Sequence, residues 1–146
     1  MSEHKARISW EKTSASFDYE EYNREHEWSF PGGITVQASA APDFKGLPNR
    51  VDPEEGLVAA LSSCHMLTFL AIASKKRLTV ESYVDEAVGY LEKNESGKLA
   101  ITRTVLRPKI QFAEDVTAED LKDMHDKAHH NCFIANSVLT KVEVEI

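Results

Sequence analysis

Cysteine is scarce in this 146-residue chain, which contains only Cys64 and Cys132. Two isolated cysteines make no Cys-rich metal pattern, and a reducing compartment disfavours a permanent structural disulfide between them. Neither a metal nor a disulfide is needed for stability, because a chain of this length buries roughly two thirds of its unfolded surface. We therefore expect no metal and no cofactor. The two thiols are either inert core residues or redox-active groups.

Concentrated positive charge is also missing. The chain has 24 acidic and 17 basic residues, a formal net charge of −7, and the two signs are mixed along its length. Binding to a phosphate backbone requires a concentrated basic face. The composition therefore predicts a soluble protein that does not bind nucleic acid.

Long hydrophobic runs are absent at the N-terminus, where MSEHKARISW lacks the apolar segment of a secretory signal. The most apolar run, Leu57 to Ala73, contains the sequence SSCH at 62–65 and is shorter than a typical membrane-spanning helix. A helix buried inside a soluble protein fits this run better than a membrane anchor. We therefore expect a cytoplasmic protein with no membrane partner.

Internal repeats, low-complexity tracts and inter-domain linkers are not found, so we expect a single domain over residues 1–146. Strand and helix patterns alternate in an order typical of an α+β fold, with a largely antiparallel sheet around one buried helix. Pro108, inside one predicted strand, implies an edge position or a bulge. The predicted strands are 6–10, 24–30, 34–40, 79–91, 98–112 and 139–146, and PGG at 31–33 joins the second and third as a hairpin.

The predicted central helix has a clear start signal. Asp52 is a good N-cap, Pro53 suits the first helical position, and Glu55 completes a pair that resembles a capping box. The helix is expected to reach about Lys76, where KKR at 75–77 complements the negative end of the helix dipole. Since it is apolar on nearly all sides, we expect other elements to enclose it.

A second helix is predicted after Thr117, and its histidines suggest a competing metal-site hypothesis. His125 and His129 share one helix face, and His130 and Cys132 follow closely. This spacing can bind zinc, but HDKAHH lacks the glutamate of a metalloprotease helix and no third ligand is evident. We therefore interpret these histidines as part of a solvated helix face.

Cys64 lies in an apolar run, and an apolar site raises the pKa of a thiol unless a positive group compensates. It is about three turns from the helix start, so the helix dipole contributes little. His65 is its neighbour, but successive helical residues point about 100° apart, so the two form no catalytic dyad. We interpret His65 as a core or interface residue. A reactive Cys64 therefore needs a cation from elsewhere in the fold, and arginine suits best because it stays charged when buried.

Two longer segments carry a family resemblance. DPEEGLVAALSSCHMLTFL at 52–70 and AHHNCFIANSVL at 128–139, followed by an alternating terminal strand, resemble the OsmC/Ohr family of osmotically inducible and organic hydroperoxide resistance proteins. The resemblance extends from the strand at 24–30 to the C-terminus. It implies a thiol peroxidase with an α+β fold, and an intertwined homodimer whose two active sites lie at the subunit interface.

The resemblance also implies roles for individual residues. Cys64 matches the family's peroxidatic cysteine, Cys132 its resolving cysteine, and Glu54 the glutamate of its PE element. The GGR motif that carries the activating arginine of Ohr members is absent. Arg24 occupies the corresponding place near the first hairpin and is our preferred candidate, and Arg50, in the loop before PEE, is its rival.

Helix geometry bears on how Glu54 acts. It precedes Cys64 by ten residues, which is about 15 Å along a straight helix and a rotation of roughly 80°. One arginine is not expected to contact both groups on one straight helix. Either the helix bends, or the Arg24–Glu54 pair reaches Cys64 from the second subunit. We favour the second arrangement, which makes the homodimer necessary for activity.

The hypothesis that results is a cysteine-based organic hydroperoxide reductase acting through a Cys64 sulfenic acid and a Cys64–Cys132 disulfide, which an external dithiol reduces. Met66, Leu67 and Phe69 favour an organic substrate over hydrogen peroxide, although such residues are also ordinary core. One alternative is a non-catalytic OsmC-like domain that binds a small molecule or senses redox state. A cysteine hydrolase is another, but no base or oxyanion-hole signature accompanies the thiol.

Overall fold

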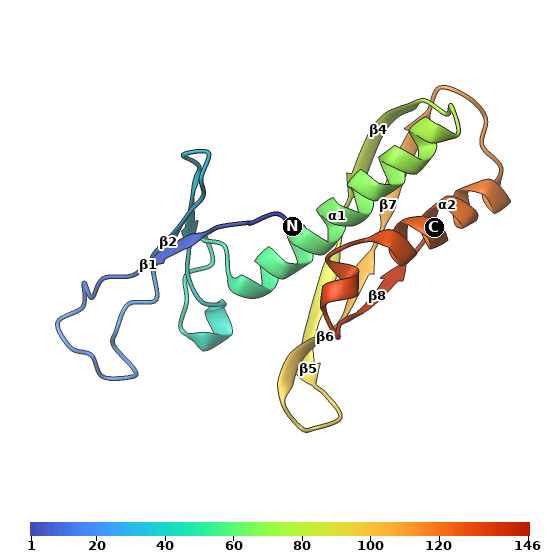
Figure 1. The fold of residues 1–146 in the computed structure, drawn as a ribbon. Helices are drawn as coiled ribbons and strands as arrows, with labels where there is room; N and C mark the ends of the chain where they lie inside the picture. The colour runs from blue at the N-terminus through green and yellow to red at the C-terminus, as the bar shows by residue number, and fades with distance from the viewer. The chain divides into compact units, whose positions relative to one another are not determined.

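Two compact units, residues 1–56 and 57–146, make up the computed structural model, which describes residues 1–146. The long helix α1, Pro53–Lys75, begins in the first unit and continues in the second. Figure 1 shows the elements in chain order. Each unit has its own strand pairing, and the single domain expected from the sequence stays a prediction.

The first unit is built on an antiparallel sheet in the order β1–β2–β3. The turn at 30–34 closes the predicted hairpin: the Phe30 N–H donates to the carbonyl oxygen of Ile34 at 2.9 Å. Gly33 has φ 81°, a backbone conformation that other residues rarely adopt. The elements are β1 Arg7–Ser9, β2 His26–Ser29, β3 Thr35–Ala38 and the 3-10 turn η1 Pro42–Phe44.

The start of α1 confirms the predicted capping box. The Glu55 N–H donates to Asp52 Oδ1 at 2.8 Å, and the Asp52 N–H donates to Glu55 Oε1 at 3.0 Å. Two N–H groups that a helix start would leave unpaired are thereby satisfied. The capping residues therefore fix the position of Glu54, which lies between them in the first turn.

The second unit contains two sheets, a β4–β7 pair and a three-stranded sheet in the order β5–β6–β8. Strand β8 runs parallel to β6, and the other pairs are antiparallel. The α+β fold with largely antiparallel sheets is thus confirmed. The strands are β4 Val80–Asp85, β5 Val88–Lys93, β6 Leu99–Leu106, β7 Pro108–Phe112 and β8 Lys141–Val144.

Two of the predicted long strands are each divided in the structure. The strand expected over 79–91 separates into β4 and β5, and the strand over 98–112 separates into β6 and β7, with Pro108 as the first residue of β7. Both breaks occur at the same level, because Asp85 pairs with Pro108 while Val88 pairs with Val105. The Arg107 N–H donates to Asp85 Oδ1 at 2.6 Å, which holds the two breaks together. A contact between residues far apart in the sequence therefore lies at the level where both strands change sheets.

Within the second unit, α1 buries a single stripe of residues spaced four apart: Leu61, His65, Phe69 and Ala73. Leu67, on another side, is 60% exposed. The chain alone therefore covers one side of the helix rather than all of it. By length and composition α1 is apolar enough to cross a membrane, a test that core helices of soluble proteins also pass.

The core of the second unit lies between the two helices. Helix α2, Ala118–Asn131, begins at the predicted cap, where the Asp120 N–H donates to Thr117 Oγ1 at 3.1 Å. Its Met124 and Ala128 pack with two residues of the buried α1 stripe. Figure 1 shows α2 and the β4–β7 pair running beside this part of α1. The half-buried residues around the cluster are Ile72, Leu78, Val80, Tyr83, Ile110, Phe112, Val116 and Leu121.

Candidate functional site

The two cysteines meet in the second unit. Cys64 is half-buried on α1, and Cys132, 1% exposed, is the C-terminal cap of α2. Both are free thiols, and their side chains lie within hydrogen-bonding reach of each other. Residues far apart in the sequence are thus adjacent because α1 and α2 pack against each other.

The turn after α2 surrounds both sulfur atoms with backbone donors. The Ala135 N–H donates to Cys132 Sγ at 3.4 Å, and the Asn136 N–H donates to the Cys132 carbonyl oxygen at 3.0 Å. The backbone N–H groups of Phe133 and Ile134 point toward Cys64. This turn leads into the 3-10 turn η2, Ala135–Ser137, inside the segment FIANS that was expected to form a turn or short helix.

The surroundings of Cys64 lower the pKa of its thiol. Burial acts to raise the pKa, but the backbone N–H of Ile134, the Cys132 thiol, the N–H of Phe133 and the Thr68 hydroxyl all favour the thiolate, and their sum prevails. The Thr68 hydroxyl also donates to the Cys64 carbonyl oxygen at 2.9 Å, so it is held beside the sulfur. The sequence indicated an arginine as the activating group of Cys64, and these neutral donors carry no sequence signal that would have revealed them.

The pKa of Cys132 moves in the opposite direction. Burial raises it, and the neighbouring Cys64 raises it further, against the opposing effect of the Ala135 and Ile134 N–H groups. The pKa of Cys64 is therefore lowered and that of Cys132 raised, so Cys64 is the more acidic thiol of the pair. A thiolate is the nucleophilic form of cysteine, and a neighbouring thiol can condense with its oxidised product.

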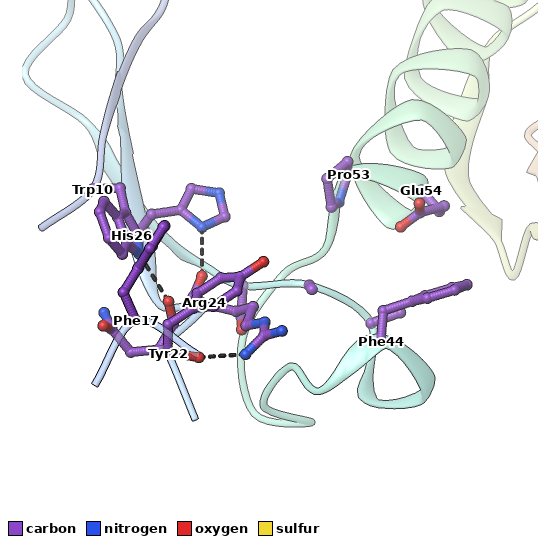
Figure 2. Close-up of a pocket in the computed structure, with 12 residues that line it drawn as sticks. Trp10, Phe17, Tyr22, Arg24, His26, Phe44, Pro53 and Glu54 are labelled. Atoms are coloured by element: carbon purple, nitrogen blue, oxygen red, sulfur yellow. Dashed lines mark hydrogen bonds between the residues drawn. The ribbon is translucent and has the colours of Figure 1, made fainter. Parts of the chain in front are cut away.

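Arg24 and Glu54 both belong to the first unit, where they line one cavity of about 440 Å³. Figure 2 shows Arg24 among aromatic side chains, and Glu54 on the first turn of α1. The cavity is lined by aromatic rings at four of its positions, and these come from the N-terminal segment and the η1 turn. They are Trp10, Phe17, Tyr22 and Phe44.

The expected pairing of Arg24 with Glu54 is not formed. The Arg24 guanidinium donates to the carbonyl oxygens of Tyr22 and Tyr19 and lies 3.5 Å from the centre of the Tyr22 ring. Glu54 Oε2 is buried and has no hydrogen-bond partner. Arg24 is therefore held by residues close to it in the sequence, because their carbonyl oxygens accept hydrogen bonds from its N–H groups. The rival, Arg50, donates to the His26 carbonyl oxygen at 3.3 Å and does not line the cavity.

One histidine prediction is confirmed and another is wrong. His65 is a core residue, 1% exposed, as expected. His125 is also buried, at 2% exposed, and does not belong to a solvated face. Its Nδ1 lies 3.0 Å from His65 Nε2. Helix α1 therefore covers the side of α2 that carries His125, which the sequence predicted to be solvent-exposed. His129 and His130 are exposed, as predicted.

Burial lowers the pKa of both imidazoles. The pKa of His65 falls to about 4, chiefly because the charged form is desolvated, with a smaller contribution from His125. The pKa of His125 is lowered by burial as well. Both rings are therefore neutral near pH 7. No group of three or more His, Cys, Asp or Glu side chains is arranged to hold a metal ion.

Comparison with known proteins gives a consistent result. The family model for OsmC-like protein matches residues 46–146. An OsmC-like protein of unknown function from Vibrio cholerae is 50% identical, with a TM-score of 0.95, over 100% of this chain and 99% of that one. The uncharacterised protein YmaD of Bacillus subtilis is 22% identical over 118 residues, which are 79% of this chain and 78% of YmaD.

Two solved structures of organic hydroperoxide resistance proteins share the fold. The protein from Elizabethkingia anophelis is 17% identical, with a TM-score of 0.70, over 98% of this chain and 94% of that one. OhrB of Bacillus subtilis is 18% identical, with a TM-score of 0.64, over 97% of this chain and 98% of that one. At this identity the likeness concerns the fold alone.

Proposed function

The chain belongs to the OsmC-like protein family, and we propose that it is a thiol peroxidase that reduces organic hydroperoxides to alcohols. One observation carries the proposal: Cys64, with a lowered pKa, lies beside Cys132, with a raised pKa. This asymmetry fits an attacking thiolate and a resolving thiol. We place the enzyme in the cytoplasm, where reducing conditions keep both thiols available.

In the proposed cycle, the Cys64 thiolate attacks the distal oxygen of the hydroperoxide. The O–O bond breaks, an S–O bond forms, and the departing alkoxide takes a proton to become the alcohol. Cys64 is left as a sulfenic acid. The Cys132 thiol then attacks the Cys64 sulfur, and the S–O bond breaks as water leaves with the thiol proton. An external dithiol reduces the Cys64–Cys132 disulfide and is itself oxidised.

The backbone donors near Cys64 have a second role in this proposal. The N–H groups of Phe133 and Ile134 stabilise negative charge on sulfur without carrying a charge of their own. Cys64 can therefore be partly activated before any arginine acts. An arginine remains necessary to polarise the peroxide, because the developing alkoxide also carries negative charge.

We assign that arginine as Arg24, with Glu54 as the carboxylate that orients it, and Arg50 as the alternative. The assignment is supported by the cavity that both residues line and by the unpaired Oε2 of Glu54, which lacks a donor that a guanidinium supplies. Pairing requires Arg24 to exchange its bonds to Tyr19 and Tyr22 for bonds to Glu54. We propose that a homodimer delivers the pair to Cys64 from the second subunit, as the helix geometry favours.

The substrate preference follows from apolar side chains close to Cys64 in the chain. Leu67 lies one helical turn beyond Cys64 and is 60% exposed, and Phe133 follows Cys132 and is 80% exposed. Both are free to contact an alkyl or aryl group. Phe69 is fully buried in the core cluster, so it contributes packing rather than substrate contact. An organic hydroperoxide gains from this apolar contact and hydrogen peroxide does not.

A thiol titration tests the proposal. Reduced wild-type protein, Cys64→Ser and Cys132→Ser are each treated with cumene hydroperoxide or hydrogen peroxide while free thiols are counted and products are identified by mass spectrometry. We expect wild type to lose both thiols to one disulfide, faster with cumene hydroperoxide. Cys132→Ser should stop at the Cys64 sulfenic acid, and Cys64→Ser should keep its remaining thiol. Wild type that keeps both thiols under excess organic peroxide favours the non-catalytic binding or sensing domain instead.

A further inference from the structure

Two buried imidazoles join the helices that carry the cysteines. His65 Nε2, on α1, lies 3.0 Å from His125 Nδ1, on α2. The rings are almost parallel, with an interplanar angle of 10° and centroids 5.3 Å apart. Neither side chain is exposed to water by more than 2%. A hydrogen bond between two helices in such surroundings is stronger than one at the surface, because water does not compete for it.

The pair is close to both sulfur atoms along the chain. His65 follows Cys64 directly, and His125 lies about two helical turns before Cys132 on the same helix. A shift of α2 along or away from α1 would therefore break the imidazole contact and move Cys132 relative to Cys64. The rest of the α1–α2 contact consists of side chains such as Phe69 and Met124, which fix the spacing less strictly than a directional hydrogen bond.

The protonation of the pair is set by its surroundings. His65 Nδ1 is buried without a partner. A proton on His65 Nε2 donates to His125 Nδ1 and leaves only a lone pair unmatched at Nδ1, whereas the other tautomer would bury an unpaired N–H. The His125 ring is also packed against Phe69, with ring centres 4.5 Å apart. The unpartnered Nδ1 therefore favours the His65 tautomer that carries its proton on Nε2 and donates to His125.

We propose that His65 and His125 are positioning residues, whose hydrogen bond holds α1 and α2 at the separation at which the Cys64–Cys132 disulfide closes. This inference rests on the proposed function in one respect only, namely that a hydroperoxide is the oxidant that converts Cys64 to the sulfenic acid. In the step that it affects, Cys132 sulfur bonds to Cys64 sulfur while the sulfenic hydroxyl leaves with the Cys132 proton as water. The pair is expected to have no effect on the preceding attack of Cys64 on the peroxide.

Four variants separate positioning from stability. His125→Leu removes the acceptor and leaves the His65 N–H unpaired, while His125→Asn puts an amide oxygen near the place of Nδ1. His65→Leu combined with His125→Leu removes both polar groups, so no unpaired group remains to unfold the protein. Met124→Ala is the control, since it removes core volume beside His125 without touching the hydrogen bond.

The decisive measurement is the thiol–disulfide equilibrium of each full-length variant in dithiothreitol redox buffers, which needs no peroxide. We expect His125→Leu and the double variant to lose about tenfold in the equilibrium constant for disulfide formation, or about 30 mV in potential. His125→Asn should regain most of it, and Met124→Ala should keep the wild-type constant despite a lower melting temperature. An unchanged constant in both leucine variants, or an equal loss in Met124→Ala, overturns the proposal. If the double variant does not fold, the comparison of His125→Leu with His125→Asn decides.

A second measurement distinguishes this proposal from the function that it assumes. Under cumene hydroperoxide, we expect wild type and the leucine variants to form the Cys64 sulfenic acid at equal rates, and the leucine variants to form more sulfinic acid, because slow disulfide closure leaves time for further oxidation. Equal sulfinic acid in all variants overturns positioning. A shift in the dithiothreitol equilibrium without any reaction toward peroxide supports the positioning role and contradicts the peroxidase.

Discussion

The backbone N–H of Ala135 donates to the Cys132 sulfur at 3.4 Å, within the turn whose Phe133 and Ile134 N–H groups face Cys64. One turn of the chain thus touches both sulfur atoms. It stabilises the thiolate on Cys64 and fixes the buried thiol that stands beside it. Residues 132–135, directly after α2, therefore contribute to the difference between the two cysteines, together with the burial that raises the pKa of both thiols.

Replacing Cys132 by alanine is expected to raise the pKa of Cys64. The substitution removes a thiol that favours the thiolate, while the backbone donors remain. A titration of thiolate absorbance in the ultraviolet measures the change. Cys132→Ser is the control, because a hydroxyl can still donate and should keep the pKa of Cys64 nearer to the wild-type value. A Cys64 pKa that is the same in all three proteins would contradict the assigned role of the Cys132 thiol.

Thr68→Val is expected to slow the reaction of Cys64 by several fold. Valine keeps the shape of threonine but removes the hydroxyl that stands beside the sulfur, so the pKa of Cys64 should rise and less thiolate should be present. The rate of alkylation by iodoacetamide, followed as a function of pH, reports this directly. Thr68→Ser retains the hydroxyl and should react like wild type; if the serine and valine variants react alike, the hydroxyl does not act on Cys64.

Acidification should destabilise the fold through the buried histidines. The pKa of His65 is about 4 in the folded chain and 6.5 without perturbation, so between these values the unfolded chain binds a proton that the folded chain does not. Stability is therefore not reduced by His65 above pH 6.5. As the pH drops from 6.5 to 4, this histidine lowers the free energy of unfolding by about 3 kcal/mol. His125 shifts in the same direction and adds to the loss.

Urea denaturation at a series of pH values tests this dependence. His65→Gln keeps a polar group but cannot be protonated, so its stability should fall less steeply over the same range. A variant that shows the wild-type slope would mean that other groups are responsible for the acid sensitivity.

Asp85→Ala is expected to lower the free energy of unfolding by about 1–3 kcal/mol. Asp85 accepts from the Ser62 hydroxyl at 2.5 Å and from the Arg107 N–H at 2.6 Å, so its loss leaves two donors without their partner. Asp85→Asn keeps one acceptor oxygen and should cost less. Thermal unfolding of the three proteins measures the order; an alanine variant as stable as the asparagine variant would show that these bonds contribute nothing net.

Arg24→Ala should reduce the rate of Cys64 oxidation by cumene hydroperoxide about a hundredfold, a typical cost for removing one electrostatic donor to a transition state. Arg50→Ala is the matched control, since Arg50 contacts the backbone of His26 and does not line the cavity with Glu54. Stopped-flow measurement of sulfenic acid formation compares the two. The reverse order of rates would assign the activating role to Arg50.

Local sequence signals predicted the local structure well. The pair Asp52 and Glu55 placed the start of α1, Thr117 placed the start of α2, and PGG at 31–33 placed the hairpin turn. Each signal depends on interactions between groups within a few residues of one another, so these interactions can be predicted from the local sequence. The family resemblance likewise rested on two contiguous segments and is confirmed by the family model.

Other features depended on residues that the sequence does not place side by side. The sequence indicated that Cys64 and Cys132 matter but could not show that they meet, nor that two strands divide where Asp85 binds the Arg107 N–H. His125 looked solvent-facing, because helical periodicity shows which residues share a face but not what covers that face.

The sequence by itself thus determined the starts of both helices, the first hairpin, the family and the two sulfurs on which the proposed chemistry depends. Tertiary structure alone decided that Cys64 is the more acidic thiol. Against the effect of burial, its pKa is lowered by N–H groups of the turn after α2 and by the Cys132 thiol, which only packing brings to it. Backbone N–H groups are present in every residue except proline, so the sequence does not reveal which of them will act on a given atom. Their effect appears only where the folded chain directs several of them at one atom.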